Sequence, residues 1–154
     1  MILENPKFTI MVIPPNANRS MWTYATVGMS VNAKSPIELH LFFLTENNEI
    51  AEILTAIAYY NITSKPLGLD DTVNFGRPWQ PNSICDHGLI SRPYLDGQEF
   101  EEVELHGELI SFFWLIPITL EERNYRWNFG IEKLEELFEI KQLNYLNPLR
   151  SSVT

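Results

Sequence analysis

The sequence is poor in cysteine, in basic residues and in long apolar runs, and each shortage argues against a class of protein. Its single cysteine, Cys85, cannot form a disulfide within the chain. The longest apolar run, residues 109–118, is too short to span a bilayer and is interrupted by Ser111 and Pro117. The first residues, MILENPKF, contain no basic segment followed by an apolar one, so no secretory signal is visible. We therefore expect a cytoplasmic protein.

Positive charge is scarce along the whole chain. Lysine and arginine together number 11, against 20 aspartates and glutamates, and the formal net charge is -9. Such an acidic balance repels phosphate backbones and anionic lipid headgroups, so we expect neither nucleic acid nor a membrane surface as a partner. The same charge would suit a basic protein partner, because complementary potentials speed encounter and select the partner.

Motifs for metals and cofactors are also missing. The three histidines, His40, His87 and His106, lie far apart and form no short-spaced ligand pair of the zinc type. The glycines of LGLDDTVNFG match neither a phosphate-binding loop nor a dinucleotide-binding fingerprint, and its two aspartates would repel phosphate. We therefore expect no metal and no cofactor.

The segment NSICDHGLISRPYLDG places Cys85, Asp86 and His87 in a row, three residue types that can carry nucleophilic chemistry. A cysteine nucleophile needs an imidazole within hydrogen-bond reach. If residues 84–91 form a strand, Asp86 points to the opposite face from Cys85, and His87 shares a face with Cys85 without being aimed at it. We predict no catalytic residue in this segment. The alternative is a small enzyme that uses Cys85 with a spatially adjacent histidine.

The periodicity of the apolar residues predicts strands and helices in partly segregated groups. Alternation and short β-branched runs predict strands at residues 8–13, 22–29, 37–44, 72–75, 84–91, 101–105 and 108–118. Helical spacing predicts helices at residues 48–60, 120–129 and 131–138. We predict a single α+β domain over residues 1–154, with a central, largely antiparallel or mixed sheet flanked by helices.

Two local signals carry a defined mechanism. Thr119 followed by Glu122 is a capping box, which predicts the start of a helix directly after the buried strand. His106 and Gly107 separate two strand-like runs and predict a tight β-hairpin. In the strand predicted at residues 37–44, Glu38 and His40 share one face. We expect this face to begin polar and to become buried further along the strand.

Acidic and aromatic side chains are the candidates for partner binding. Glutamates gather on the predicted hairpin and on the last helix, and either group could be a solvated face or a docking surface for a basic partner. Trp79, between prolines in RPWQP, is either a core anchor under a loop or an interface anchor. Asp86 and His87 are more plausible as contacts than as catalysts. The predicted partner-binding residues are Trp79, Asp86, His87, Glu99, Glu101, Glu102 and Glu104.

The order of several segments resembles the bacterial branch of the suppressor of fused family. The segments are the strand with Ile13-Pro14-Pro15, the strand leading to Gly28-Met29-Ser30, FFWLIPITLEERNYRWNFGIEKLEELF, and the closing NYLNPLRSSV. The likeness extends from Phe8 to about Val153. Only seven residues precede Phe8, whereas family members carry a further helical segment there, so this domain is expected to lack an N-terminal helical segment.

What the resemblance implies is a non-enzymatic binding domain. Animal members act as regulators that hold a peptide of a transcription factor as an added strand. Bacterial members resemble immunity proteins that bind and neutralise a cognate polymorphic toxin, and many such toxins act on nucleic acid through basic surfaces. The resemblance carries no active-site residue onto this chain. A regulatory or oligomerisation domain that pairs through an exposed strand edge is the other alternative.

Overall fold

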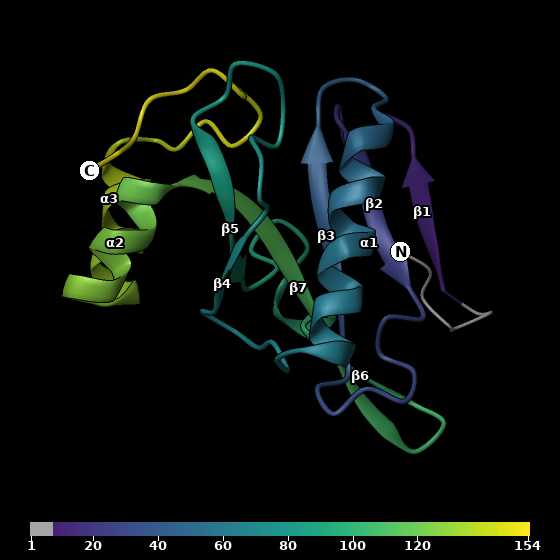
Figure 1. Cartoon of the computed structure of the whole chain (residues 1–154). Coiled ribbons are helices and arrows are strands. Elements are labelled where there is room, and N and C mark those ends of the chain that lie inside the picture. The colour runs from purple at the N-terminus through teal and green to yellow at the C-terminus, as the bar shows by residue number, and fades with distance from the viewer. Residues whose placement is uncertain (1–7) are drawn as a thin grey trace.

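The computed structural model describes residues 8–154, and in this range seven strands form one mixed sheet (Figure 1). The order across the sheet is β1-β2-β3-β7-β5-β4, and β6 pairs with β7. Only β3 and β7 run parallel, and the other pairs are antiparallel. The strands are β1 (Thr9–Ile13), β2 (Trp22–Val27), β3 (Ile37–Phe43), β4 (Thr72–Asn74), β5 (Cys85–Ser91), β6 (Glu102–Leu105) and β7 (Glu108–Thr119). The predicted α+β class and largely antiparallel sheet are confirmed.

Three α-helices and one short 3-10 helix complete the described part of the chain. They are α1 (Asn48–Thr63), η1 (Gln98–Phe100), α2 (Leu120–Phe129) and α3 (Ile131–Ile140). Asn47 caps α1 by accepting a hydrogen bond from the amide of Glu49, at 2.8 Å. Gly130 separates α2 from α3 with a φ of 93°, a conformation that glycine adopts without strain. The chain can therefore turn sharply between the two helices.

Alternation along the central strands divides the core between the two faces of the sheet. Leu39 and Leu41 of β3 and Leu115 of β7 pack in one cluster with the apolar side of α1. Phe42, Trp114 and the following alternate residues of β7 point the other way, into a cluster that includes Leu134 and Phe138 of α3. Figure 1 shows α1 over β1–β3, with α2 and α3 at the other end of the sheet beyond β5. The helices thus cover different halves of the two faces.

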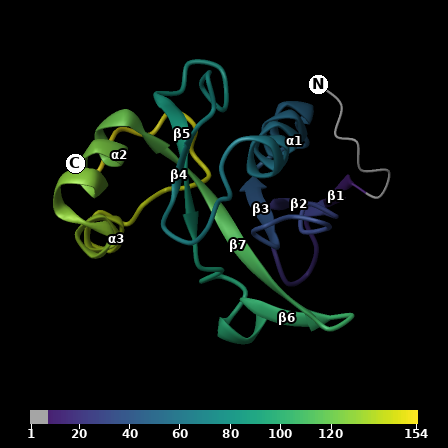
Figure 2. The ribbon, with the colours of Figure 1, turned by 60° about the horizontal axis from the view of Figure 1, so that its bottom comes forward.

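The β6–β7 hairpin forms as predicted and projects from the rest of the molecule. Its turn residues, His106 and Gly107, have φ values of 53° and 79°, as a two-residue turn with both central residues left-handed requires. Figures 1 and 2 both show this hairpin extending away from α2 and α3. Glutamates on the hairpin therefore form a surface separate from that of the last helix.

Two details of the sheet differ from the sequence-based predictions. A β-bulge between Cys85 and His87 inserts one extra residue on β5, opposite Ile118 and Thr119 of β7. Cys85 consequently lies in the cluster under α1, whereas His87 pairs with Ile118 on the other face. The prediction that Cys85 and His87 share a face was wrong, because strict alternation does not survive a bulge.

The second difference concerns β3, whose seven residues are all buried. Glu38 can be buried because hydrogen-bond donors surround its carboxylate. Its carboxylate accepts hydrogen bonds from the Thr26 hydroxyl at 2.7 Å and from the amides of Met29 at 3.1 Å and Ser30 at 3.0 Å. His40 lies 3.2 Å from the Asp96 carboxylate, which also binds Arg19. Polar partners within the chain, rather than solvent, therefore account for the burial of Glu38 and His40.

A buried ion pair ties the C-terminal segment to the sheet and to α2. Two guanidinium nitrogens of Arg150 lie 2.6 Å and 2.9 Å from the two carboxylate oxygens of Glu122, which is fully buried. Arg150 also donates to the carbonyl of Pro117 in β7, at 2.9 Å. The same carboxylate accepts from the Thr119 amide and completes the predicted capping box. One side chain thus links the end of β7, the start of α2 and the tail.

We predict that Arg150→Ala lowers the free energy of unfolding by about 3–5 kcal/mol, because it leaves the Glu122 carboxylate buried without its counter-charge. Urea denaturation followed by tryptophan fluorescence measures the loss. Lys133→Ala is the control, since Lys133 makes an exposed pair with Glu136 at 3.6 Å, worth about 1 kcal/mol or less. Equal losses in the two variants would contradict this role for the buried pair.

Candidate protein-binding groove

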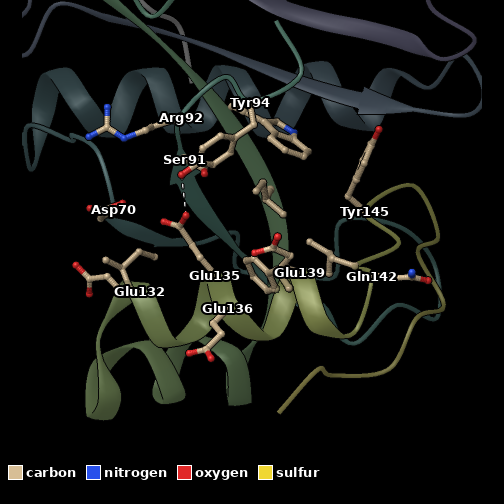
Figure 3. Close-up of a pocket in the computed structure, with 15 residues that line it drawn as sticks. Asp70, Ser91, Arg92, Tyr94, Glu132, Glu135, Glu136, Glu139, Gln142 and Tyr145 are labelled. Atoms are coloured by element: carbon tan, nitrogen blue, oxygen red, sulfur yellow. Dashed lines mark hydrogen bonds between the residues drawn. The ribbon is translucent and has the colours of Figure 1, made fainter. Parts of the chain in front are cut away.

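A large hollow lies between α3 and the end of the sheet that α1 does not cover. It has a volume of about 890 Å³ and is open to solvent on one side. Its walls come from four separate parts of the chain: the turn before β4, the end of β5 with the following loop, the middle of β7, and α3 with the tail after it. Figure 3 shows α3 along one wall, with Tyr94 and the strands opposite. Residues distant in sequence therefore meet here.

Apolar and aromatic side chains make the floor of this groove. Trp114 and Ile116 come from alternate positions of β7, which places them on the same face of the sheet. Tyr145 of the tail packs edge-to-face against Trp114, with the ring centroids 4.9 Å apart. Phe138 and Leu143 also line the groove. The floor is thus a ready apolar contact surface.

Carboxylates surround that floor. Five lining residues are acidic and one is basic; they are Asp70, Glu132, Glu135, Glu136, Glu139 and Arg92. In Figure 3 Glu135 and Glu139 point from α3 toward the groove, while Glu136 points away from it. Arg92 is already engaged, since it donates to Glu101 at 2.6 Å outside the groove. The inner surface consequently carries an excess of negative charge.

The electrostatics of the groove reflect this crowding of like charges. Burial, and next the Glu135 carboxylate, raise the pKa of Asp70, although Arg126 and Arg92 oppose the change. Tyr94 donates a hydrogen bond to Glu135 Oε2 at 2.7 Å, drawn as the dashed line in Figure 3. Partial desolvation, and then this bond to Glu135, raise the pKa of Tyr94 to about 12, although 56% of the residue surface is exposed. Both pKa shifts favour the protonated, uncharged forms of Asp70 and Tyr94.

The residues predicted from sequence are divided among three places. Trp79 is only 1% exposed and packs edge-to-face against Phe43, so its indole is a core anchor and is not available to a partner in this structure. Asp86 and His87 contact each other at 2.7 Å on β5, with His87 buried. Neither residue lines the groove.

The remaining predicted residues belong to the projecting hairpin and the segment before it. Glu99, Glu102 and Glu104 are exposed, while Glu101 is half-buried and bound to Arg92. The α3 glutamates, which the sequence marks as an acidic helix face, are the ones that meet the aromatic floor. Asp70, Ser91, Tyr94 and Tyr145 carry no sequence signal for such a role, because only the sheet topology brings them together.

Residues 8–154 lack two kinds of feature, a metal-binding cluster and a membrane-spanning helix. No group of three or more histidine, cysteine, aspartate or glutamate side chains in this range is arranged to hold a metal ion. No helix in the same range has both the length and the apolar character needed to cross a membrane. Burial raises the pKa of the Cys85 thiol, which keeps the sulfur protonated rather than nucleophilic.

Comparison with known proteins places this fold. A model of the family described as suppressor of fused protein matches residues 4–151. The chain belongs to the suppressor of fused family. The family assignment confirms the resemblance that the segment order indicates, from the Ile-Pro-Pro strand to the closing Pro148 and Arg150. The predicted absence of an N-terminal helical segment concerns the chain before Phe8 and lies outside the described residues.

Solved structures of suppressor of fused proteins share the architecture. A suppressor of fused homolog from Neisseria gonorrhoeae FA 1090 has 33% sequence identity and a TM-score of 0.84, and the match covers 97% of this chain and 79% of that one. Drosophila Suppressor of Fused has 12% identity and a TM-score of 0.69, with 95% of this chain and 42% of that chain covered. A Sufu–Fu complex matches with the same identity and TM-score, covering 95% and 76%. Among curated proteins, none matches this chain.

We predict that Tyr94 titrates well above an ordinary tyrosine and that Glu135→Gln lowers its pKa from about 12 toward 10, because the variant removes the neighbouring negative charge. NMR of the chain with carbon-13 in its six tyrosine rings resolves the individual titrations. Tyr94 in the native chain should still be protonated at pH 11, whereas it should be ionising in the variant. An unchanged Tyr94 titration in the Glu135→Gln chain would show that the hydrogen bond does not form in solution.

Proposed function

We propose that this chain is a non-enzymatic protein-binding domain, an immunity protein that binds and neutralises a cognate polymorphic toxin in the cytoplasm. The observation that carries the proposal is the groove between α3 and the sheet, where an aromatic floor is surrounded by carboxylates. Protein interfaces favour an apolar centre with a polar rim, and charge complementarity selects the partner. An acidic groove of this kind suits a basic toxin surface.

Two further observations support binding over catalysis. Cys85 is buried, its pKa is raised, and the β5 bulge directs His87 to the opposite face of the sheet, so the pair lacks the contact that a nucleophile and its base need. A distant structural neighbour is a Sufu–Fu complex, in which the same fold type holds a protein partner. The partner of the present chain differs in our proposal, since it is a basic toxin domain.

The test is complex formation with the toxin encoded beside this gene. We expect isothermal titration calorimetry at about 50 mM salt to detect a complex, and about 300 mM salt to weaken it, because the Debye length shortens as salt rises. The toxin's activity should be inhibited at matching concentrations. Absence of both a complex and inhibition at low salt would sink the immunity proposal.

Cys85→Ser separates this proposal from a cysteine-dependent enzyme. The substitution keeps the size of the side chain, so we expect the toxin affinity to change by less than about twofold. Unaltered protection of cells that express the toxin would accompany it. If Cys85→Ser abolished protection while leaving the complex intact, the enzyme alternative would replace the binding proposal.

A further inference from the structure

The groove is lined by five carboxylates and one basic residue, so the described chain balances its negative charge only in part. Burial first, and then the Glu135 carboxylate, raise the pKa of Asp70, while Arg126 and Arg92 oppose the change. Arg92, the one basic residue among those that line this groove, is bound to Glu101, and Lys133 on α3 is paired with Glu136. A cation entering from outside would relieve the repulsion between these carboxylates. The charge of the groove therefore favours a positively charged ligand.

A second, independent feature of the groove is the Ser91 hydroxyl. Ser91 is the last residue of β5, is only 3% exposed, and lines the groove next to Tyr94 (Figure 3). Among the described residues its side chain has no hydrogen-bond partner. Its oxygen is not one of the enclosed polar atoms that lack a partner, so it is open to the groove, where water can bind it. A ligand that donates hydrogen bonds would supply that partner.

The aromatic floor of the groove favours one kind of cation over another. Trp114 lines the groove, and Tyr145 meets it edge-on, so an aromatic surface lies between the acidic wall of α3 and the end of β5. A guanidinium group is planar, stacks on aromatic faces and is more weakly hydrated than an ammonium group. Its five N–H donors can reach acceptors on several sides at once, and here Asp70, Glu135 and Ser91 stand on separate elements. These features together favour arginine over lysine.

We propose that the groove binds an arginine side chain of the partner protein, with the guanidinium over the aromatic floor and its donors directed to Glu135, Glu139, Asp70 and the Ser91 hydroxyl. The volume of about 890 Å³ exceeds what one side chain fills, so flanking residues of the same partner segment occupy the remainder. This assignment rests on the proposed function for the identity of the partner. It can be tested without that partner.

The first test uses a defined probe, the capped peptide acetyl-Gly-Arg-Ser-Arg-Gly-amide, added to the nitrogen-15-labelled chain. We expect NMR shift changes at Ser91, Glu135 and the Trp114 indole N–H. The same peptide with citrulline in place of arginine has the same shape and no charge, and should produce at least tenfold smaller changes at equal concentration. Equal changes with the two peptides, or changes confined to the hairpin, would overturn the assignment.

Matched variants identify which acidic surface binds the arginine peptide. Glu135→Gln with Glu139→Gln removes two charges from the groove wall, and Glu102→Gln with Glu104→Gln removes two from the projecting hairpin. We expect the groove variant to weaken binding of the arginine peptide at least tenfold and the hairpin variant to weaken it less than threefold. Ser91→Ala should weaken it severalfold with no change in net charge. Equal weakening by both double variants would mean that only net charge matters, and would refute a specific site.

Binding of the toxin itself distinguishes this inference from the proposed function. A toxin that binds the native chain and the groove variant equally well leaves the immunity proposal standing and refutes the groove as its contact. A toxin that does not bind at all, while the arginine peptide still occupies the groove, refutes the immunity proposal and leaves the arginine site standing. Thermal unfolding of each variant, compared with the native chain, identifies any change that comes from loss of fold.

Discussion

The buried pair of Glu122 and Arg150 is the constraint on which the C-terminal half of the molecule depends. Glu122 accepts from Arg150, from the Thr119 amide and from the Val153 amide at 3.0 Å, so one carboxylate fixes the start of α2 and the end of the tail. Because the tail is held there, the segment between α3 and Arg150 must cross back over the sheet. Tyr145 then packs on Trp114 and completes the floor of the groove. The ion pair thus acts on the candidate site indirectly, by positioning one of its walls.

Much of the fold follows from signals that are local in sequence. The Thr119–Glu122 capping box, the Asn47 cap and the His106–Gly107 turn each act over a few residues, and the structure contains all three. The bulge at Cys85–His87 was not predicted, because it depends on how β5 meets β7 rather than on the residues of β5 alone. Trp79 could not be assigned from sequence for a related reason. Its burial against Phe43 joins a loop to a strand far away in the chain.

The candidate site was only partly predictable. Four glutamates on the last helix indicate an acidic face, but the same pattern describes a helix face that meets only solvent. What changes their meaning is the opposite wall, where Asp70, Ser91 and Tyr94 arrive from loops and from the end of β5. The hairpin, whose glutamates look equivalent in the sequence, extends away from α3 (Figure 2). Long-range topology, which periodicity does not reveal, makes the distinction.

Buried carboxylates elsewhere in the molecule are surrounded by hydrogen-bond donors, unlike those of the groove. Glu38 is buried and surrounded by donors from Thr26 and residues 28–30, and Glu122 is equally well supplied. Both satisfy the general rule that a buried charge needs partners. The groove differs, since its carboxylates stay half-buried or exposed and repel one another, and the one basic residue among those that line it, Arg92, is bound to Glu101. Proteins keep such local conflicts mainly where a ligand resolves them. The repulsion between these carboxylates would then add to the free energy that favours a cationic partner.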